Sequence, residues 1–262
     1  MRKVLLINPP ELIHGSYFPP PLGLLYLAGI LREKGIDVQL VDGCISGWSG
    51  VRENIRSYSP DIVGITCHTP ARKKSLSVAE MVKDINRNIT VVLGGAHPTI
   101  MYQQLIEHYD TVDIVIRGEG EITFLEISQG IDLDKIDGIV YREGTKVKKN
   151  AERKYVENLD TLPFPAWDLI ADTLWKYPST FPSELRYQNS IDLAYGPRVP
   201  VVYSRGCKGH CDFCSSWWIW KKVRYRSAKN MVDELEWLYE SFKIRHFCFF
   251  DDSLTMDKQA TI

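Results

Sequence analysis

Three cysteines stand close together in the stretch SRGCKGHCDFCSSWW, at Cys207, Cys211 and Cys214. A structural zinc site takes four ligands, and disulfides use cysteines in pairs. Three thiolates can instead hold three irons of a four-iron, four-sulfur cluster and leave the fourth iron with an open coordination position. An open position is what distinguishes a reactive metal site from a structural one.

The residues beside these cysteines suit such a cluster. Gly206 and Gly209 give a tight loop the backbone freedom that it needs to surround an inorganic core. Arg205, Lys208 and His210 would offset part of the negative charge of the thiolates. The loop is therefore predicted to be an iron–sulfur site.

The spacing Cys-x-x-x-Cys-x-x-Cys resembles the signature of radical S-adenosylmethionine enzymes, with Phe213 just before the third cysteine and a strand, VPVVYSRGC, leading into the loop. The resemblance implies that the amino and carboxylate groups of S-adenosylmethionine chelate the open iron. One electron from the cluster then breaks the sulfonium bond. The products are methionine and a 5′-deoxyadenosyl radical, which takes hydrogen from a substrate.

The same resemblance implies further contacts with S-adenosylmethionine. A polar group at the end of the second barrel strand commonly binds the methionine amino group, and Asp251, Asp252 and Ser253 stand there, with Phe213 counted beside them. The alternative for any one of these polar residues is a solvated or helix-capping role.

Zinc is the competing interpretation of the loop, with His210, His246 or Cys248 as the fourth ligand. Zinc motifs favour two separated Cys-x-x-Cys halves, which this sequence lacks. Cys248, in HFCFF, is most simply a core thiol. Cys44 and Cys67 are interpreted in the same way, although Cys67 could face a ligand.

An aromatic and basic stretch, WWIWKKVRYRSAKN (217–230), follows the loop. It could bind nucleic acid, but the net charge of the chain is −1 and gives that no support. We expect a flap over the cluster, with Arg224 and Arg226 near anionic groups of S-adenosylmethionine or substrate, and with Lys221 and Lys222 on the surface.

Short apolar runs and amphipathic stretches alternate regularly over the first 130 residues. Apolar runs predict strands at 3–8, 37–42, 61–67, 90–95 and 112–118. Amphipathic stretches predict helices at 22–35, 50–59, 74–88, 101–109 and 122–130. Five such units predict a Rossmann-like, doubly wound parallel sheet, whose ligands lie beyond the carboxyl ends of the strands.

The remainder divides into two parts. Residues 131–198 are expected to form a hairpin over 137–150, turning at Glu143-Gly144, and then an ordered connector stiffened by prolines. Residues 199–262 predict a strand, the cysteine loop, a helix over 227–242 capped by Ser227, and a strand within 244–255. A complete (β/α) barrel takes ~200 residues or more, so this last part is expected to be the opening segment of a radical-type barrel in a longer protein. The predicted domains are thus 1–130, 131–198 and 199–262.

The whole arrangement resembles the cobalamin-binding group of radical enzymes. The matching segments are NPP (8–10), PPLGLLYLAGILREKG (20–35), VVLGGAHPT (91–99) and IRGEGE (116–121). The resemblance implies cobalamin at the carboxyl edge of the first sheet. The residues it assigns to cobalamin are Pro10, Thr66, His68, Thr69, Gly94, Gly95, His97, Gly118, Glu119 and Glu121.

Several of these assignments have a physical basis. Gly94 and Gly95 let the backbone approach a flat ligand without Cβ clashes. Thr66, His68 and Thr69 offer hydroxyl and imidazole partners. Glu119 or Glu121 could accept propionamide N–H groups, or could simply favour a helix N-terminus.

One departure from the group concerns cobalt. Enzymes that ligate cobalt with histidine carry D-x-H-x-x-G after the first strand, whereas this chain has NPPELIHGSYFPPP, with His14 but no matching aspartate. Ligation of cobalt by His14 is therefore not expected. The departure also leaves open that no cobalamin binds.

Composition limits the setting of the protein. The first apolar run has five residues before it meets prolines, and no run reaches membrane-spanning length. A pI near 6.6 gives no general attraction to nucleic acid or to anionic membranes. We expect a cytoplasmic protein whose six cysteines serve as metal, redox or buried thiols.

The predicted function is that of a cobalamin-dependent radical S-adenosylmethionine enzyme that transfers a methyl group to an unactivated carbon of a small-molecule or natural-product substrate. A flavodoxin- or ferredoxin-type protein would donate the electron. The alternatives are a radical cyclase of the magnesium-porphyrin type and a non-catalytic cobalamin- or tetrapyrrole-binding module with a zinc-filled or vestigial cysteine loop.

Overall fold

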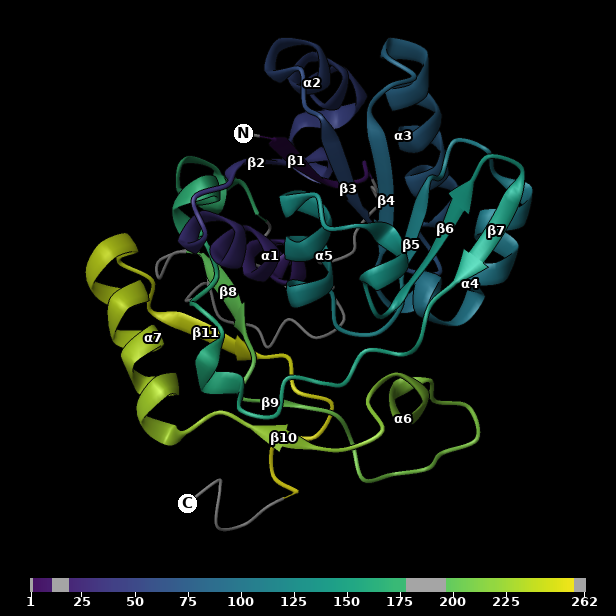
Figure 1. Cartoon of the computed structure of the whole chain (residues 1–262). Helices are drawn as coiled ribbons and strands as arrows, with labels where there is room; N and C mark the ends of the chain where they lie inside the picture. The colour runs from purple at the N-terminus through teal and green to yellow at the C-terminus, as the bar shows by residue number, and fades with distance from the viewer. Residues whose placement is uncertain (1, 11–18, 178–196, 257–262) are drawn as a thin grey trace. The chain divides into compact units, whose positions relative to one another are not determined.

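The computed structural model describes residues 2–10, 19–177 and 197–256. Within these ranges the chain forms two compact units (Figure 1). The first contains residues 2–10, 23–155 and 165–169; the second contains 19–22, 156–164, 170–177 and 197–256. His14 and the part of the connector from 178 to 196 lie outside the described residues.

The first unit is built on a seven-stranded sheet with the order β2-β1-β3-β4-β5-β6-β7. Five strands are parallel: β1 (Lys3–Asn8), β2 (Asp37–Asp42), β3 (Ile62–Thr66), β4 (Thr90–Gly94) and β5 (Ile114–Ile116). The expected hairpin follows as β6 (Ile139–Glu143) and β7 (Lys146–Lys149), and its antiparallel strands extend the sheet beyond β5. The Rossmann-like prediction is confirmed.

Helices cover both faces of this sheet (Figure 1). They are α1 (Leu22–Glu33), α2 (Gly43–Tyr58), α3 (Arg72–Ile85), α4 (Ala96–His108) and α5 (Glu121–Gln129). Alternate strand residues such as Leu5 and Ile7 pack in one core with α2, α3 and α4. On the other face Gly64 lies so close to α5 that an added Cβ would stand 2.8 Å from the Phe124 ring. The strands β1, β3, β4 and β5 are therefore buried on both sides, which explains their uninterrupted apolar runs.

Two helices begin earlier than the sequence predicts. α2 starts at Gly43, with Asp42 as its N-cap, and includes a non-helical Gly47 (φ 67°). α4 starts directly after Gly95, and Met101 interrupts it with φ −101° and ψ 20°. Glycine is unfavourable in helices, so stretches rich in glycine indicate turns rather than helix starts.

The second unit contains two small sheets and two helices. Strand β8 (Arg198–Val201) pairs in parallel with β11 (His246–Phe249), and β9 (Ser204–Arg205) pairs antiparallel with β10 (Arg224–Tyr225). The helices are α6 (Ser216–Ile219) and α7 (Ala228–Phe242). As predicted, Ser227 caps α7: its hydroxyl accepts the N–H of Asn230 at 3.1 Å. Among the described residues, 3-10 helices occur at Leu133–Lys135 in the first unit, at Leu159–Thr161 in the second, and at Trp167–Lys176, which belongs partly to each.

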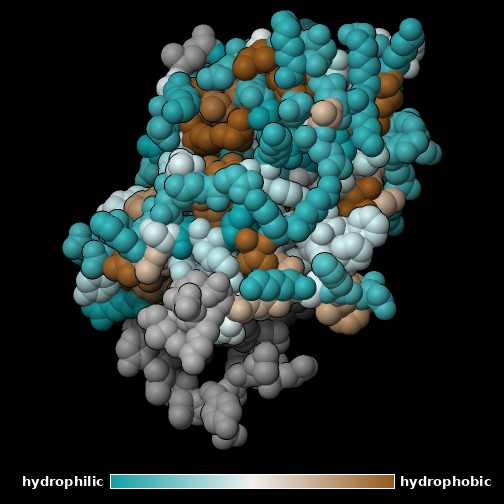
Figure 2. Space-filling model, turned by 60° about the horizontal axis from the view of Figure 1, so that its bottom comes forward, coloured by the Kyte–Doolittle hydropathy of each residue, from teal (hydrophilic) through white to brown (hydrophobic). Residues whose placement is uncertain are grey.

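The surface is of mixed character. On the face drawn in Figure 2, hydrophilic residues surround scattered hydrophobic ones. No helix in the described part of the chain is both long and apolar enough to traverse a lipid bilayer.

Candidate functional site

The cysteine loop of the second unit leaves from β9 and returns to β10. These two strands pair Arg205 with Arg224 and Ser204 with Tyr225, and thereby close the base of the loop. Gly206 follows β9 with φ 103°, and an added Cβ would lie 2.6 Å from the carbonyl oxygen of Lys222. Only glycine fits there without strain, because the conformation and the contact both exclude a side chain.

The three thiols lie along this loop and remain accessible, since Cys207 and Cys214 are half-buried and Cys211 is exposed. Backbone N–H groups donate to two of the sulfurs, from Gly209 to Cys207 Sγ at 3.3 Å and from Ser216 to Cys214 Sγ at 3.5 Å. A Cβ on Gly209 would stand 3.4 Å from Cys207 Sγ and 3.7 Å from Cys211 Sγ. Such N–H···S bonds stabilise thiolates and influence the reduction potential of a bound cluster.

A cluster and a single metal ion make different demands on the positions of three thiolates. Among the described residues, no three His, Cys, Asp or Glu side chains are grouped to hold one metal ion. In a cluster each thiolate binds its own iron, so the sulfurs do not need to converge on one point.

Of the candidate fourth ligands for zinc, Cys248 is disfavoured by its burial, and His210 lies beside Trp217. The His210 ring lies 5.5 Å from the ring of Trp217. Cys248 lies within β11 opposite Pro200, and burial raises the pKa of its thiol, which the charge of Arg198 only partly opposes. A raised pKa disfavours the thiolate that a metal requires.

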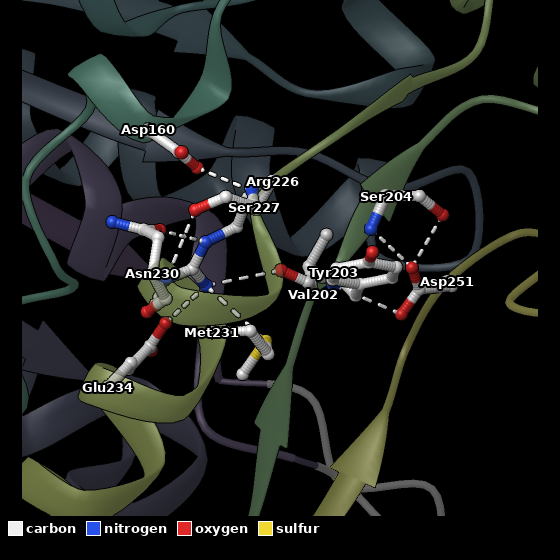
Figure 3. A network of polar contacts seen from close by, with 10 residues as sticks. All are labelled: Asp160, Val202, Tyr203, Ser204, Arg226, Ser227, Asn230, Met231, Glu234 and Asp251. Carbon is white, nitrogen blue, oxygen red and sulfur yellow. Dashed lines mark hydrogen bonds and ion pairs between the residues drawn. The ribbon is translucent and has the colours of Figure 1, made fainter. Parts of the chain in front are cut away.

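The two acidic residues after β11 contact opposite ends of the cysteine loop: Asp251 contacts its start (Figure 3) and Asp252 its end. Asp251 accepts hydrogen bonds from the Tyr203 N–H at 3.2 Å, from the Ser204 N–H and from the Ser204 hydroxyl at 2.5 Å. Asp252 is exposed and accepts the Ser216 hydroxyl at 2.7 Å.

The other two residues expected near S-adenosylmethionine differ in exposure. Ser253 is half-buried, and Phe213 is 94% exposed. The four positions thus differ in how much of each side chain is available to a ligand.

The basic residues that follow the loop lie differently from our expectation. Arg226 is buried and forms an ion pair with the fully buried Glu234, and Arg224 is buried and donates to the Val156 carbonyl at 2.7 Å. Figure 3 shows the Arg226 guanidinium surrounded by Val202, Asn230, Met231 and Glu234. Arg226 therefore serves the packing of α7 and is not an open anion-binding group.

In the first unit the residues expected to bind cobalamin lie at or after the carboxyl ends of four parallel strands, β1, β3, β4 and β5. Gly95 follows β4 with φ 110°, and an added Cβ would lie 3.0 Å from the Cys67 carbonyl oxygen and 3.5 Å from Thr66 Oγ1. The ends of β3 and β4 are thus in close contact, and Gly95 is exposed. Gly94 is half-buried, with the nearest atom 4.0 Å from a Cβ.

Thr69 and His97 are brought together across the same edge. Thr69 Oγ1 lies 3.1 Å from His97 Nδ1, whereas Nε2 of His97 is buried with no hydrogen-bond partner. Burial, and secondarily the charge of Arg72, lower the pKa of His97 from its ordinary value of 6.5. The imidazole is therefore neutral near pH 7, with one nitrogen available to a ligand. His68 lies between Thr66 and Thr69 in sequence and, unlike His97, is exposed.

The end of β5 is joined to the end of β4 by Thr99. Its hydroxyl donates to the Gly95 carbonyl at 2.8 Å and accepts the N–H of Gly118 at 3.0 Å. Glu119 and Glu121 are both buried, and Glu121 is the first residue of α5, which agrees with the helix N-terminus interpretation for that residue.

Pro10, Cys44 and Cys67 also lie near the carboxyl ends of β1, β2 and β3. Pro10 is buried, and an added Cβ on Gly43 would lie 2.6 Å from its nitrogen. Cys67 is fully buried, as expected for a core thiol, and Cys44 Sγ donates to the Pro9 carbonyl at 3.6 Å.

Some residues of these sites could not be found from the sequence. Ser204, Ser216 and Thr99 each make a hydrogen bond that supports a site residue. A serine or threonine in a loop has no distinguishing pattern, and only the fold reveals these three.

Comparison with known proteins adds independent findings. Residues 12–128 match the B12 binding domain family. An uncharacterized methyltransferase of Pyrococcus horikoshii is 35% identical over 274 aligned residues, which cover 100% of this chain and 56% of that protein. The anaerobic magnesium-protoporphyrin IX monomethyl ester cyclase of Rubrivivax gelatinosus is 32% identical, over 99% of this chain and 47% of the cyclase.

A solved structure shares the fold. The radical S-adenosylmethionine methyltransferase TsrM from Kitasatospora setae, solved with cobalamin and a [4Fe-4S] cluster bound, superposes with a TM-score of 0.73 at 20% identity. The match covers 99% of this chain and 49% of TsrM. The chain spans about half the length of the curated relatives reported above.

Proposed function

Because the chain belongs to the cobalamin-binding radical S-adenosylmethionine family, we propose that it serves an enzyme that transfers a methyl group to an unactivated carbon. One observation supports this most: three accessible thiols share a loop that Gly206 closes, and two of their sulfurs accept backbone N–H groups. The match to a B12 binding domain accounts for the first unit of the same chain.

Cys207, Cys211 and Cys214 would hold a four-iron, four-sulfur cluster. When bound, the cluster supplies the single electron that cleaves S-adenosylmethionine reductively. The chain itself contributes placement: the β9–β10 pair fixes the base of the loop, and the N–H groups of Gly209 and Ser216 stabilise the negative charge on sulfur.

S-adenosylmethionine would lie beside the end of β11. Of the polar residues there, Asp252 is the best candidate for the methionine amino group, because it is exposed and accepts the Ser216 hydroxyl through Oδ2. A carboxylate has about four lone-pair sites. Ser253 and the exposed ring of Phe213 would complete the contacts.

Cobalamin would bind at the carboxyl edge of the first sheet and supply the methyl carrier. Gly94 and Gly95 would let the backbone approach the ligand. His97 Nε2 is a buried polar atom without a partner, and burying such an atom unpaired is costly; a hydrogen bond to the ligand would satisfy it. Pro10, Thr66, His68, Thr69, Gly118, Glu119 and Glu121 would line the remainder of the site.

The proposal also includes a substrate class and an electron donor. The substrate would be a small molecule or natural product, and a flavodoxin- or ferredoxin-type protein in the cytoplasm would supply the electron. A radical cyclisation is the second candidate, because the Rubrivivax gelatinosus cyclase is 32% identical over 99% of this chain.

One preparation of the intact chain tests the iron site of the second unit and the cobalamin site of the first. The purified chain is reconstituted under oxygen exclusion with iron and sulfide, incubated with hydroxocobalamin and gel-filtered. We expect a brown protein that retains the corrin, loses the brown colour in Cys207→Ala and retains the corrin in that variant. A colourless protein that carries zinc would overturn the enzyme proposal in favour of a binding module.

A further inference from the structure

The segment that enters the cysteine loop is held from two sides. Tyr203 and Ser204 are buried and lie between β8 and Gly206. On one side Asp251 accepts both of their backbone N–H groups and the Ser204 hydroxyl. One carboxylate thus accepts all three hydrogen bonds, although Asp251 lies 47 positions after Ser204 in sequence.

On the other side stands Arg226. Its backbone N–H donates to the Tyr203 carbonyl at 2.9 Å, and its guanidinium donates to the Val202 carbonyl at 3.3 Å. The ion pair with Glu234 fixes the guanidinium on α7. Figure 3 shows Asp251 and Arg226 on opposite sides of the Val202–Ser204 backbone.

We propose that Asp251 is a positioning residue for the iron–sulfur cluster, which orients the entry to the loop before Cys207, whereas Asp252 is the member of the pair that contacts S-adenosylmethionine. This inference rests on the proposed function. The two neighbouring carboxylates thus have different tasks, one directed at the protein backbone and the other at the ligand.

Apart from Asp251 and Arg226, the entry to the loop is held by the short β9–β10 ladder. The β9–β10 ladder joins only two residue pairs, and Cys207 is the third residue after Ser204. Hydrogen bonds to a charged acceptor are stronger than those to a neutral one. In Asp251→Asn, the amide nitrogen of the new side chain would face one of the three donors, so at least one hydrogen bond is lost and a donor–donor contact replaces it.

The test measures how firmly the cluster is held. Wild type, Asp251→Asn and Asp252→Asn are reconstituted with iron and sulfide, and the release of iron to a chelator is followed at constant pH. Asp251→Asn should release iron about tenfold faster than wild type, since one charged hydrogen bond typically changes an equilibrium by about that factor. Asp252→Asn should stay within about twofold of wild type, because its amide oxygen still accepts the Ser216 hydroxyl.

A second readout separates the two roles. The electron paramagnetic resonance spectrum of the reduced cluster is recorded with and without S-adenosylmethionine. Asp252→Asn should need a higher S-adenosylmethionine concentration to change the spectrum. In Asp251→Asn, the spectrum should differ from wild type before S-adenosylmethionine is added.

The possible outcomes are distinguishable. Equal iron release and equal spectra in Asp251→Asn and wild type would overturn the positioning role and leave the proposed function intact. A wild-type chain that takes up no iron would refute the proposed function itself. If circular dichroism shows that Asp251→Asn is unfolded without cluster, Ser204→Ala replaces it. That variant removes only the hydroxyl bond; about threefold faster release is expected, and an unchanged rate would overturn the inference.

Discussion

Replacing Gly206 with alanine should disrupt the cysteine loop more than any other single methyl group added there. The backbone has φ 103° at this residue. A left-handed backbone costs a residue with a Cβ roughly 1–2 kcal/mol. In addition, the new Cβ would lie 2.6 Å from the Lys222 carbonyl oxygen, so backbone atoms must move by about 0.8 Å to restore an ordinary contact of 3.4 Å. Overpacking of this kind costs about 1–3 kcal/mol.

The free energy of unfolding of the second unit should therefore fall by roughly 2–5 kcal/mol. Tryptophan fluorescence in a urea titration reports this unit selectively, because five of the seven tryptophans belong to it. After reconstitution, the variant should also hold much less iron than wild type, since Cys207 is the next residue.

Gly144→Ala is the matched control. Gly144 also has a positive φ, 60°, but nothing lies within 4 Å of an added Cβ. Its cost should be limited to the roughly 1–2 kcal/mol of the backbone conformation and should fall on the first unit, which contains Gly144; the second unit should keep its stability and its full iron content. If Gly206→Ala were as stable as wild type and held as much iron, the close contact with Lys222 and the reasoning built on it would be wrong.

Three further predictions concern the packing and the titration of the chain. Glu234→Ala should lower the free energy of unfolding by about 3–5 kcal/mol, because it leaves Arg226 buried without its partner; replacing both residues with apolar ones should recover much of the loss, as a urea titration can measure. Gly64→Ala should destabilise the first unit by about 1–3 kcal/mol through its contact with Phe124, and unchanged thermal unfolding would contradict this. Folding lowers the pKa of His97, so the unfolded state binds the proton more readily than the folded state. The contribution of His97 to the free energy of unfolding is therefore complete above about pH 6.5 and decreases as the pH falls below that value. In urea titrations, His97→Gln should lose less free energy of unfolding between about pH 7 and 5.5 than wild type does.

The sequence was most informative where one residue type repeats along an element. The apolar runs of β1 to β5 predict a parallel sheet covered on both faces, and the structure confirms it. The spacing of the three cysteines predicts a loop after a strand, and β8 and β9 precede it. Such local patterns suffice because strand burial and loop length depend on neighbours in sequence.

Contacts between distant residues could not be predicted in this way. Nothing in FFDDS indicates that Asp251 accepts hydrogen bonds from Tyr203 and Ser204. From its place in a basic stretch we expected Arg226 near anionic groups of S-adenosylmethionine or substrate, yet the structure pairs it with Glu234. Pairing of this kind depends on how α7 packs against the loop entry, which is a property of the fold.

An open iron in the cysteine loop is best tested by the electron paramagnetic resonance spectrum of the reconstituted, reduced chain before and after addition of S-adenosylmethionine. If one iron has an open coordination position, we expect the signal of a reduced four-iron cluster, and this signal should change when S-adenosylmethionine binds. The signal should be absent from Cys211→Ala. A protein that is silent in this measurement and contains one zinc ion held by four protein ligands would contradict the account.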